Sequence, residues 1–211
     1  MHLEAITSNA KKIFQKLDNF SSFYLAGGTG LALQIGHRIS VDFDFFWGKD
    51  IPKNLFLKVK EVFGNFKIEV IINNSSQITV LVNGVTLSFI KYPFPVILKL
   101  IGYKGIKILP PLEIAAMKAY ALGRRATLKD YVDLYYFLKG KTEGLEDIVK
   151  LCERKYDQEF DTRLFLEQLI YSKDIEDMEI KFLKNKVNKS EIKKFFEKEI
   201  KKLKYVWVKI K

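Results

Sequence analysis

The chain has 211 residues, of which 48% are hydrophobic and 14% aromatic, so it is globular rather than disordered and can bury one good core with a helical appendage. Its only cysteine, Cys152, excludes an internal disulfide and fits a reducing cytosol, and no apolar run is long enough to span a bilayer. We therefore expect a cytoplasmic protein with no membrane partner. Its formal net charge of +11 is suited to binding an anionic molecule.

The N-terminal segment is predicted to form a helix over residues 3–18. Ile6, Ala10, Ile13 and Leu17 recur every three or four residues, which places them on one helical face. Residues 22–46 then have the pattern of a strand, a glycine turn, a short helix and a second strand. This second segment is the most informative one, because glycines and aspartates stand at its turning points.

The glycine turn consists of Gly27 and Gly28, before a helix expected from Thr29 to Ile35. A strand, a glycine turn and a helix start leave backbone N–H groups facing outward, where they can bind the oxygens of a phosphate. Thr29 is expected to cap this helix or to donate its hydroxyl to a phosphate. A diglycine turn taken alone also serves backbone geometry, and that alternative stays open.

Two aspartates, Asp42 and Asp44, stand one residue apart in the strand that follows. Side chains alternate along a strand, so both carboxylates are expected on one face, with Val41, Phe43 and Phe45 on the other. Neighbouring carboxylates repel each other unless a cation lies between them, and Mg²⁺ (or Mn²⁺) bound to carboxylates, water and substrate phosphates would meet that need. The pair thus indicates metal-assisted phosphoryl or nucleotidyl transfer, with a solvated sheet edge as the alternative.

Short strands and then helices fill the remainder of the chain. A helix is predicted over residues 55–63, strands over 66–72, 77–82 and 86–92, a short helix over 96–101 and a short strand over 106–109. Asn83-Gly84 is the strongest hairpin signal in the sequence. From Leu112 onward the pattern is helical, over 112–122, 127–138 and several further helices to about residue 203. The sequence therefore predicts an α/β part followed by an all-helical part.

These motifs resemble a known signature. Ala26-Gly27-Gly28, followed after 13 residues by Asp42-Phe43-Asp44-Phe45, is similar to the pattern of the polymerase-beta-type nucleotidyltransferase superfamily. The string YLAGGTGLALQIGHR with DFDFF resembles, more narrowly, the AbiEii/AbiGii toxin family, and residues 115–138 resemble that family's downstream lysine and aspartate motifs. The resemblance covers residues 20–140 and implies an α/β (α+β) nucleotidyltransferase domain over 1–140, with a small mixed or antiparallel sheet flanked by helices. Residues 141–211 match no motif of the family and are expected to form a helical lysine-rich extension.

The resemblance also implies roles for three residues in the helical part. Lys118, on the apolar helix 112–122, would bind nucleotide phosphates, although such a lysine can also extend its ammonium into solvent. Arg125 would assist it. Asp130 would act as a base or orient Lys118, although an acid in a first helical turn is also a common partner of the helix dipole.

Arg38 and Ser40 precede the acidic strand and are candidate ligands of the nucleotide. The planar guanidinium of Arg38 suits a phosphate, and an ion pair with Asp42 or Asp44 is the competing interpretation.

One expected feature of the superfamily is missing. A third carboxylate is usual on a neighbouring strand, but residues 86–92 contain no acid and have Ser88 where one is expected. Glu69 is a candidate substitute, and a solvated surface glutamate is its alternative interpretation. The departure puts two-metal chemistry in doubt and leaves open a site with one metal, completed by substrate phosphates.

The C-terminal segment carries most of the positive charge. Residues 181–211 hold twelve lysines and three glutamates, a net charge of +9, and no arginine. Such a segment either contacts a phosphate backbone without reading bases, or is a helix with a solvated lysine face.

Three functions follow from these patterns. The first is a Mg²⁺-dependent nucleotidyltransferase that moves NMP from an NTP to a hydroxyl acceptor. The resemblance implies that such an enzyme is the toxin of a toxin–antitoxin or phage-defence pair with a cognate antitoxin, and that its acceptor is tRNA or protein. The second is a nucleotidyltransferase-shaped module with a decayed site, which binds RNA or protein without turnover. The third is an antibiotic-modifying transferase with the same site and a small-molecule hydroxyl as acceptor.

Overall fold

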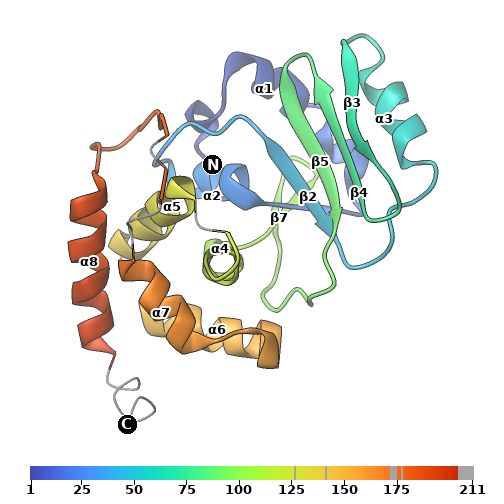
Figure 1. The fold of residues 1–211 in the computed structure, drawn as a ribbon. Helices are drawn as coiled ribbons and strands as arrows, with labels where there is room; N and C mark the ends of the chain where they lie inside the picture. The colour runs from blue at the N-terminus through green and yellow to red at the C-terminus, as the bar shows by residue number, and fades with distance from the viewer. Residues whose placement is uncertain (126, 141, 172–174, 177, 204–211) are drawn as a thin grey trace. The chain divides into compact units, whose positions relative to one another are not determined.

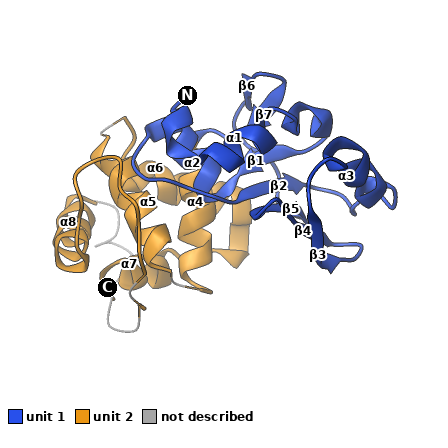
Figure 2. Ribbon diagram, turned by 90° about the horizontal axis from the view of Figure 1, so that it is seen from above, with its two compact units in different colours: residues 1–110 blue, residues 111–211 orange. Residues whose placement is uncertain are grey.

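The computed structural model describes residues 1–125, 127–140, 142–171, 175–176 and 178–203 (Figure 1). The chain divides into two compact units, unit 1 with residues 1–110 and unit 2 with residues 111–211 (Figure 2). Every described strand belongs to unit 1, whereas the described elements of unit 2 are all helical. An α/β part followed by a helical part is therefore confirmed, and the boundary between the two compact units lies at Pro110–Pro111.

A mixed seven-stranded sheet forms the centre of unit 1. Its order is β3-β4-β5-β2-β1-β7-β6; β1 pairs with β7 and β2 with β5 in parallel, and the other neighbours are antiparallel. The strands are β1 (Tyr24–Ala26), β2 (Phe43–Trp47), β3 (Ile68–Asn73), β4 (Gln77–Val82), β5 (Val85–Lys91), β6 (Ile101–Tyr103) and β7 (Ile106–Ile108). The two strands with functional residues, β1 and β2, are thus central and paired with each other.

Helices and an aromatic core complete unit 1. The helices are η1 (Leu3–Ala5), α1 (Ser8–Phe14), η2 (Leu17–Phe20), α2 (Gly27–Ile35) and α3 (Leu55–Phe63). The single helix predicted over residues 3–18 is wrong, because three short helices replace it and Thr7 caps α1 by accepting from the N–H of Ala10 at 3.2 Å. The ring of Phe89 on β5 packs against Phe20, Phe23 and Phe45 with centroids 4.8, 5.0 and 5.6 Å away.

Two hairpins show how turn residues shape the sheet. Asn83 and Gly84 both have positive φ, 48° and 81°, and join β4 to β5 as predicted. Lys104 and Gly105 do the same, with φ of 48° and 76°, between β6 and β7. The short helix predicted over residues 96–101 is wrong, because residues 96–100 form no helix and Ile101 begins β6.

Unit 2 consists of the helices α4 (Pro111–Leu122), α5 (Leu128–Lys139), α6 (Leu145–Tyr156), η3 (Asp157–Glu159), α7 (Thr162–Ile170) and α8 (Lys189–Lys202). The predicted helices 112–122 and 127–138 are confirmed. An aromatic row on α5 is buried; it comprises Tyr131, Tyr135, Tyr136 and Phe137. None of the described helices is both long and apolar enough to cross a membrane.

Two buried polar features of unit 2 are structural. Lys155 on α6 and Glu113 on α4 form an ion pair at 2.7 Å, with both side chains 0% exposed. Cys152, three residues before Lys155 on α6, is also buried, and burial raises the pKa of its thiol well above the usual value. A thiol with a raised pKa holds its proton at neutral pH, so Cys152 is a poor nucleophile.

Candidate active site

The turn between β1 and α2 brings a glycine against a carboxylate. Ala26, the last residue of β1, pairs in register with Asp44 of β2. Gly27 follows with φ of +63°, and a Cβ added to it would lie 2.7 Å from Oδ2 of Asp44. Glycine is required at position 27 for two reasons: a left-handed backbone disfavours any side chain, and the carboxylate of Asp44 occupies the space that a Cβ would need.

Gly28 is needed for a different close approach. Its φ is not positive, but an added Cβ would lie 2.5 Å from Nη2 of Arg38 and 3.4 Å from Oγ of Ser40. Arg38 is 2% exposed and donates from Nη1 to the carbonyl of Ile39 at 3.2 Å. A buried guanidinium beside the first turn of a helix adds its charge to the positive end of the helix dipole, so the arrangement favours an anion.

Thr29 ties this turn to the segment before β2. Its hydroxyl donates to the carbonyl of Asp42 and shares a hydrogen bond of 2.8 Å with the hydroxyl of Ser40. Ser40 is held in turn by a backbone hydrogen bond of 2.8 Å to Ala5. The expectation that Thr29 caps α2 is wrong, because Ala26 is at the cap position and no side chain caps this helix.

The acidic pair lies where this turn meets β2. Asp44 is in the strand, whereas Asp42 precedes it, since β2 begins at Phe43. Phe43 and Phe45 enter the core at 0% and 1% exposure, as the alternation predicts, while Val41 is 44% exposed and does not join them. Asp42 and Asp44 are both half-buried, and the contacts of Thr29 and Gly27 place them against the start of α2.

The position next to Asp44 on the neighbouring strand is occupied by Ser88. The two residues are partners in the parallel pairing of β2 with β5. Ser88 is 5% exposed and its hydroxyl accepts a hydrogen bond from Thr79 at 3.2 Å. The sequence-based expectation that Ser88 stands on a neighbouring strand, where a third acid is usual, therefore agrees with the pairing of β2 and β5.

Glu69 does not replace that acid, so its assignment as a substitute ligand is wrong. It lies on β3, which is separated from β2 by both β4 and β5, or about 14 Å at the usual strand spacing. Its carboxylate is exposed and pairs with Lys67 at 2.6 Å. No cluster of three or more metal-binding side chains forms among the residues that the structure describes.

The donor set around Asp44 nevertheless fits a hard cation. Asp42 and Asp44 carry carboxylate oxygens in one short segment, and Ser88, at the paired position of β5, carries a hydroxyl oxygen beside Asp44. Mg²⁺ prefers such ligands and usually takes one or two carboxylates while water and substrate phosphates complete its shell. Two aspartates are thus sufficient for a site of this class.

Lys118 is the centre of a buried ion-pair cluster in unit 2. From α4 its ammonium donates to Asp130 at 2.8 Å and lies 2.6 Å from Asp133, both of which are on α5. Thr127 holds the other oxygen of Asp130 at 2.7 Å. Asp130 is therefore an ion-pair partner of Lys118. Lys118 does not extend into solvent, since it is 7% exposed. Arg125, in the turn after α4, is exposed.

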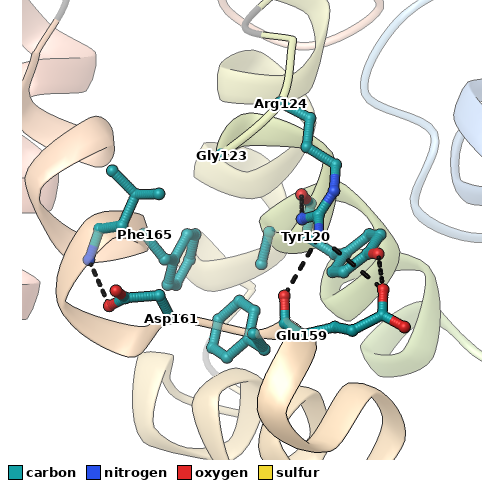
Figure 3. A pocket seen from close by; sticks show the side chains of 9 residues that line it. Tyr120, Gly123, Arg124, Glu159, Asp161 and Phe165 are labelled. Atoms are coloured by element: carbon teal, nitrogen blue, oxygen red, sulfur yellow. Dashed lines mark hydrogen bonds and ion pairs between the residues drawn. The ribbon is translucent and has the colours of Figure 1, made fainter.

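Unit 2 also contains a cavity of about 300 Å³ that the sequence did not indicate (Figure 3). The ring of Tyr120 lies between the guanidinium of Arg124, 3.6 Å from its centroid, and the ring of Tyr156, 4.0 Å away. The hydroxyl of Tyr120 donates to Glu159 at 2.8 Å; burial, followed by this hydrogen bond, raises the pKa of Tyr120. The lining residues are Ala119, Tyr120, Gly123, Arg124, Glu159, Phe160, Asp161, Leu164 and Phe165. None of the predicted site residues is among them.

The sequence of the chain is similar to those of known proteins. The family model described as the nucleotidyl transferase AbiEii toxin of type IV toxin–antitoxin systems matches residues 12–75 and 65–206. The protein aq_aa25 of Aquifex aeolicus (strain VF5) is 31% identical over 156 residues, which is 73% of this chain and 75% of that protein.

Solved structures share the fold at low identity. MenT4, a nucleotidyltransferase toxin of Mycobacterium tuberculosis H37Rv, is 17% identical with a TM-score of 0.60, covering 92% of this chain and 84% of that one. JHP933 from Helicobacter pylori is 21% identical with a TM-score of 0.52, covering 80% and 73%. The antibiotic-resistance factor ANT(2'')-Ia is 10% identical with a TM-score of 0.50, covering 70% and 90%. Together with the diglycine turn and the two aspartates, the family match shows that the chain is a nucleotidyltransferase of the AbiEii toxin family.

Proposed function

We propose that this enzyme transfers an NMP group from an NTP to a hydroxyl of tRNA or protein, as the toxin of a toxin–antitoxin pair. In this reaction the acceptor oxygen forms a bond to the α-phosphorus, the bond between that phosphorus and the β-bridging oxygen breaks, and pyrophosphate leaves. The hydroxyl proton passes to a base or to water. The same proposal gives the enzyme a cognate antitoxin and a cytoplasmic location, where NTPs are available.

The observation that carries the proposal is the contact of Gly27 with Asp44. A carboxylate packed against the N-terminal turn of a helix brings together a ligand for a cation and backbone N–H groups that can bind an anion. A polyphosphate neutralised by a divalent metal needs both of these at once.

The residues of unit 1 divide this work. Asp42 and Asp44 would hold Mg²⁺ or Mn²⁺, which supplies charge neutralisation at the phosphates and activation of the attacking hydroxyl. Gly27 and Gly28 would leave the N-terminal N–H groups of α2 open to phosphate oxygens, since neither has a side chain to cover them. Arg38 would add a charged donor, held in place by burial.

The proposal also gives roles to Thr29 and Ser40 in unit 1 and to three residues of unit 2. Thr29 and Ser40 would keep the glycine turn and Asp42 in place through their hydrogen bonds, and either hydroxyl is a further candidate ligand of the nucleotide. Lys118 would bind substrate phosphate, with Asp130 orienting its ammonium and Arg125 supplying a second cation.

A transfer assay tests the proposal. The purified chain is incubated with Mg²⁺ and each α-³²P-labelled NTP, with total tRNA, a protein extract or an aminoglycoside as acceptor. We expect label in the tRNA or protein fraction for at least one NTP. Label only in the aminoglycoside would indicate a small-molecule acceptor instead.

A second candidate function has one observation in its favour. The missing third acid beside Asp44 suits a decayed module that binds without turnover. No label in any fraction, together with retained NTP binding, would support the module and contradict the transferase.

Replacing Gly27 with alanine is expected to strain the backbone and also to displace the carboxylate of Asp44. The left-handed conformation costs an alanine about 1–2 kcal/mol, and the new Cβ would also push Asp44 aside. Because a shift of about 1 Å in a catalytic group can cost about a hundredfold, we expect a loss of that order in kcat. Steady-state transfer kinetics and thermal unfolding measure the two effects.

Gly84→Ala is the matched control for this variant. Gly84 has a φ of +81°, but an added Cβ meets nothing within 4 Å. We expect a similar loss of stability with kcat unchanged. If the two variants lose activity equally, strain and not the site explains the effect of Gly27→Ala.

A further inference from the structure

The described part of the C-terminal segment is strongly basic. Residues 181–203 contain nine lysines and three glutamates, a net charge of +6 (9 − 3), and no arginine. Helix α8 carries six of these lysines and all three glutamates. The arrangement of these charges on the helix decides whether the surface is simply solvated or is suited to a partner.

One side of α8 is fixed by packing. Asn188 accepts from the N–H of Glu191 at 2.9 Å and the carboxylate of Glu191 accepts from the N–H of Asn188 at 2.9 Å, so a capping box begins the helix. Ile192 and Phe196, four residues apart, are 3% and 0% exposed. They define the side of α8 that faces the remainder of unit 2, where α8 contacts α5 and α7.

Three lysines form a stripe on the opposite side. Lys194, Lys198 and Lys201 are all exposed and are spaced four and three residues apart. At 100° per residue they cluster about 180° from the direction of Ile192 and Phe196. We call Lys194, Lys198 and Lys201 the lysine stripe.

The acids of α8 pair away from the stripe. Glu191 closes the capping box, Glu197 lies 4.0 Å from Lys193, and Glu199 lies 2.5 Å from Lys202. Both lysines of these pairs belong to the flanks of the helix and not to the stripe. Within the described ranges, no ion pair joins an acid to any lysine of the stripe.

Like charges three or four residues apart on a helix repel each other by about 0.2–0.5 kcal/mol per pair, as Lys194, Lys198 and Lys201 do. A polyanion would remove that repulsion. The stripe spans about 10 Å of helix axis, comparable to about three successive phosphates of one nucleic-acid strand. Lysine without arginine suits phosphate contact rather than recognition of bases.

We propose that the lysine stripe of α8 binds the phosphate backbone of the RNA that accepts the NMP group. The inference rests on the proposed function for the role of the bound RNA, and it selects RNA over protein as the acceptor. Binding to the stripe is independent of sequence and falls steeply as salt rises, because each phosphate contact releases condensed counterions.

Binding is measured on the full chain carrying Asp44→Ala, so that turnover does not interfere. Fluorescently labelled tRNA is titrated by anisotropy between 50 and 200 mM KCl. In the stripe variant, Lys194→Gln, Lys198→Gln and Lys201→Gln are combined. We expect its affinity at 100 mM salt to fall by about tenfold or more and its log–log salt slope to fall by about 2–3 units.

The matched control removes the same charge from unit 1. Lys12, Lys49 and Lys53 are exposed, and their combined replacement by Gln is expected to change the affinity by less than about threefold. Equal losses in the two triple variants would show diffuse attraction and overturn the proposal. An unchanged affinity in the stripe variant would overturn it as well.

Two further outcomes separate this inference from others. If poly-glutamate binds the stripe as tightly as tRNA and loses affinity in the same variant, the surface is a docking site for an acidic protein and the proposal is wrong. Absence of label transfer with stripe-dependent tRNA binding intact would sink the proposed transferase alone. Transfer to tRNA that is unaffected by the stripe variant would overturn the inference alone.

Discussion

Replacing Asp44 with asparagine is expected to lower nucleotidyl transfer by about a thousandfold or more. Asparagine has nearly the same shape, so the strand and the contact with Gly27 are kept while the negative charge is lost. A neutral amide binds Mg²⁺ weakly and does not offset the charge of the metal at the phosphates. The measurement is transfer of label from the NTP, made beside thermal unfolding to show that the fold is retained.

Asp50→Asn is the control for this variant. Asp50 follows β2, is 73% exposed in its side chain and pairs with Lys91 at 2.7 Å on the surface. We expect its activity to stay within about twofold, because an exposed ion pair contributes little. A fall of less than tenfold for Asp44→Asn would remove Asp44 from the catalytic machinery, and the proposed metal site with it.

The largest effect on stability is expected for Lys155→Met. This change leaves Glu113 as a fully buried carboxylate without its ammonium partner, 2.7 Å away in the native chain. Breaking a buried ion pair on one side costs about 3–5 kcal/mol, which lowers the Tm of a chain of this length by about 10 °C. Thermal and urea unfolding of the full chain measure the loss.

The double variant Glu113→Gln with Lys155→Met distinguishes charge from packing. It removes both charges while roughly keeping both volumes, and such replacements are often close to neutral. We expect most of the lost stability to return. A double variant as unstable as Lys155→Met would show that the pair matters through its shape and not through its charges.

Local sequence patterns predicted several elements of the fold well. The helices 55–63, 112–122 and 127–138 and the hairpin at Asn83–Gly84 are present, because each is encoded by its own periodicity or turn residues. The first helix failed, since Thr7 and the residues after Phe14 divide a continuous apolar face into three short helices. The second hairpin was missed because Lys104-Gly105 lacks the asparagine that usually signals a turn with two positive φ values.

The partners of individual side chains were harder to predict. Glu69 was a reasonable third ligand in the sequence, but the strand order places β4 and β5 between it and Asp44. For Lys118, in contrast, the sequence did indicate a partner that the structure places beside it. The family pattern indicated Asp130, and Asp133, one helical turn further along α5, lies 2.6 Å from the same ammonium, in agreement with the expectation that it pairs with a neighbouring helix.

The sequence by itself determined the class of the protein, because the glycine turn, the paired aspartates and their spacing lie within one short continuous segment. Only the tertiary structure decided which side chains meet: that Arg38 packs on Gly28, that Thr29 bonds to Ser40, and that Lys118 is enclosed by two carboxylates. The reason is physical. Periodicity and turn chemistry act over a few residues, whereas strand order, register and helix packing join residues far apart in the chain through burial, which no local pattern encodes.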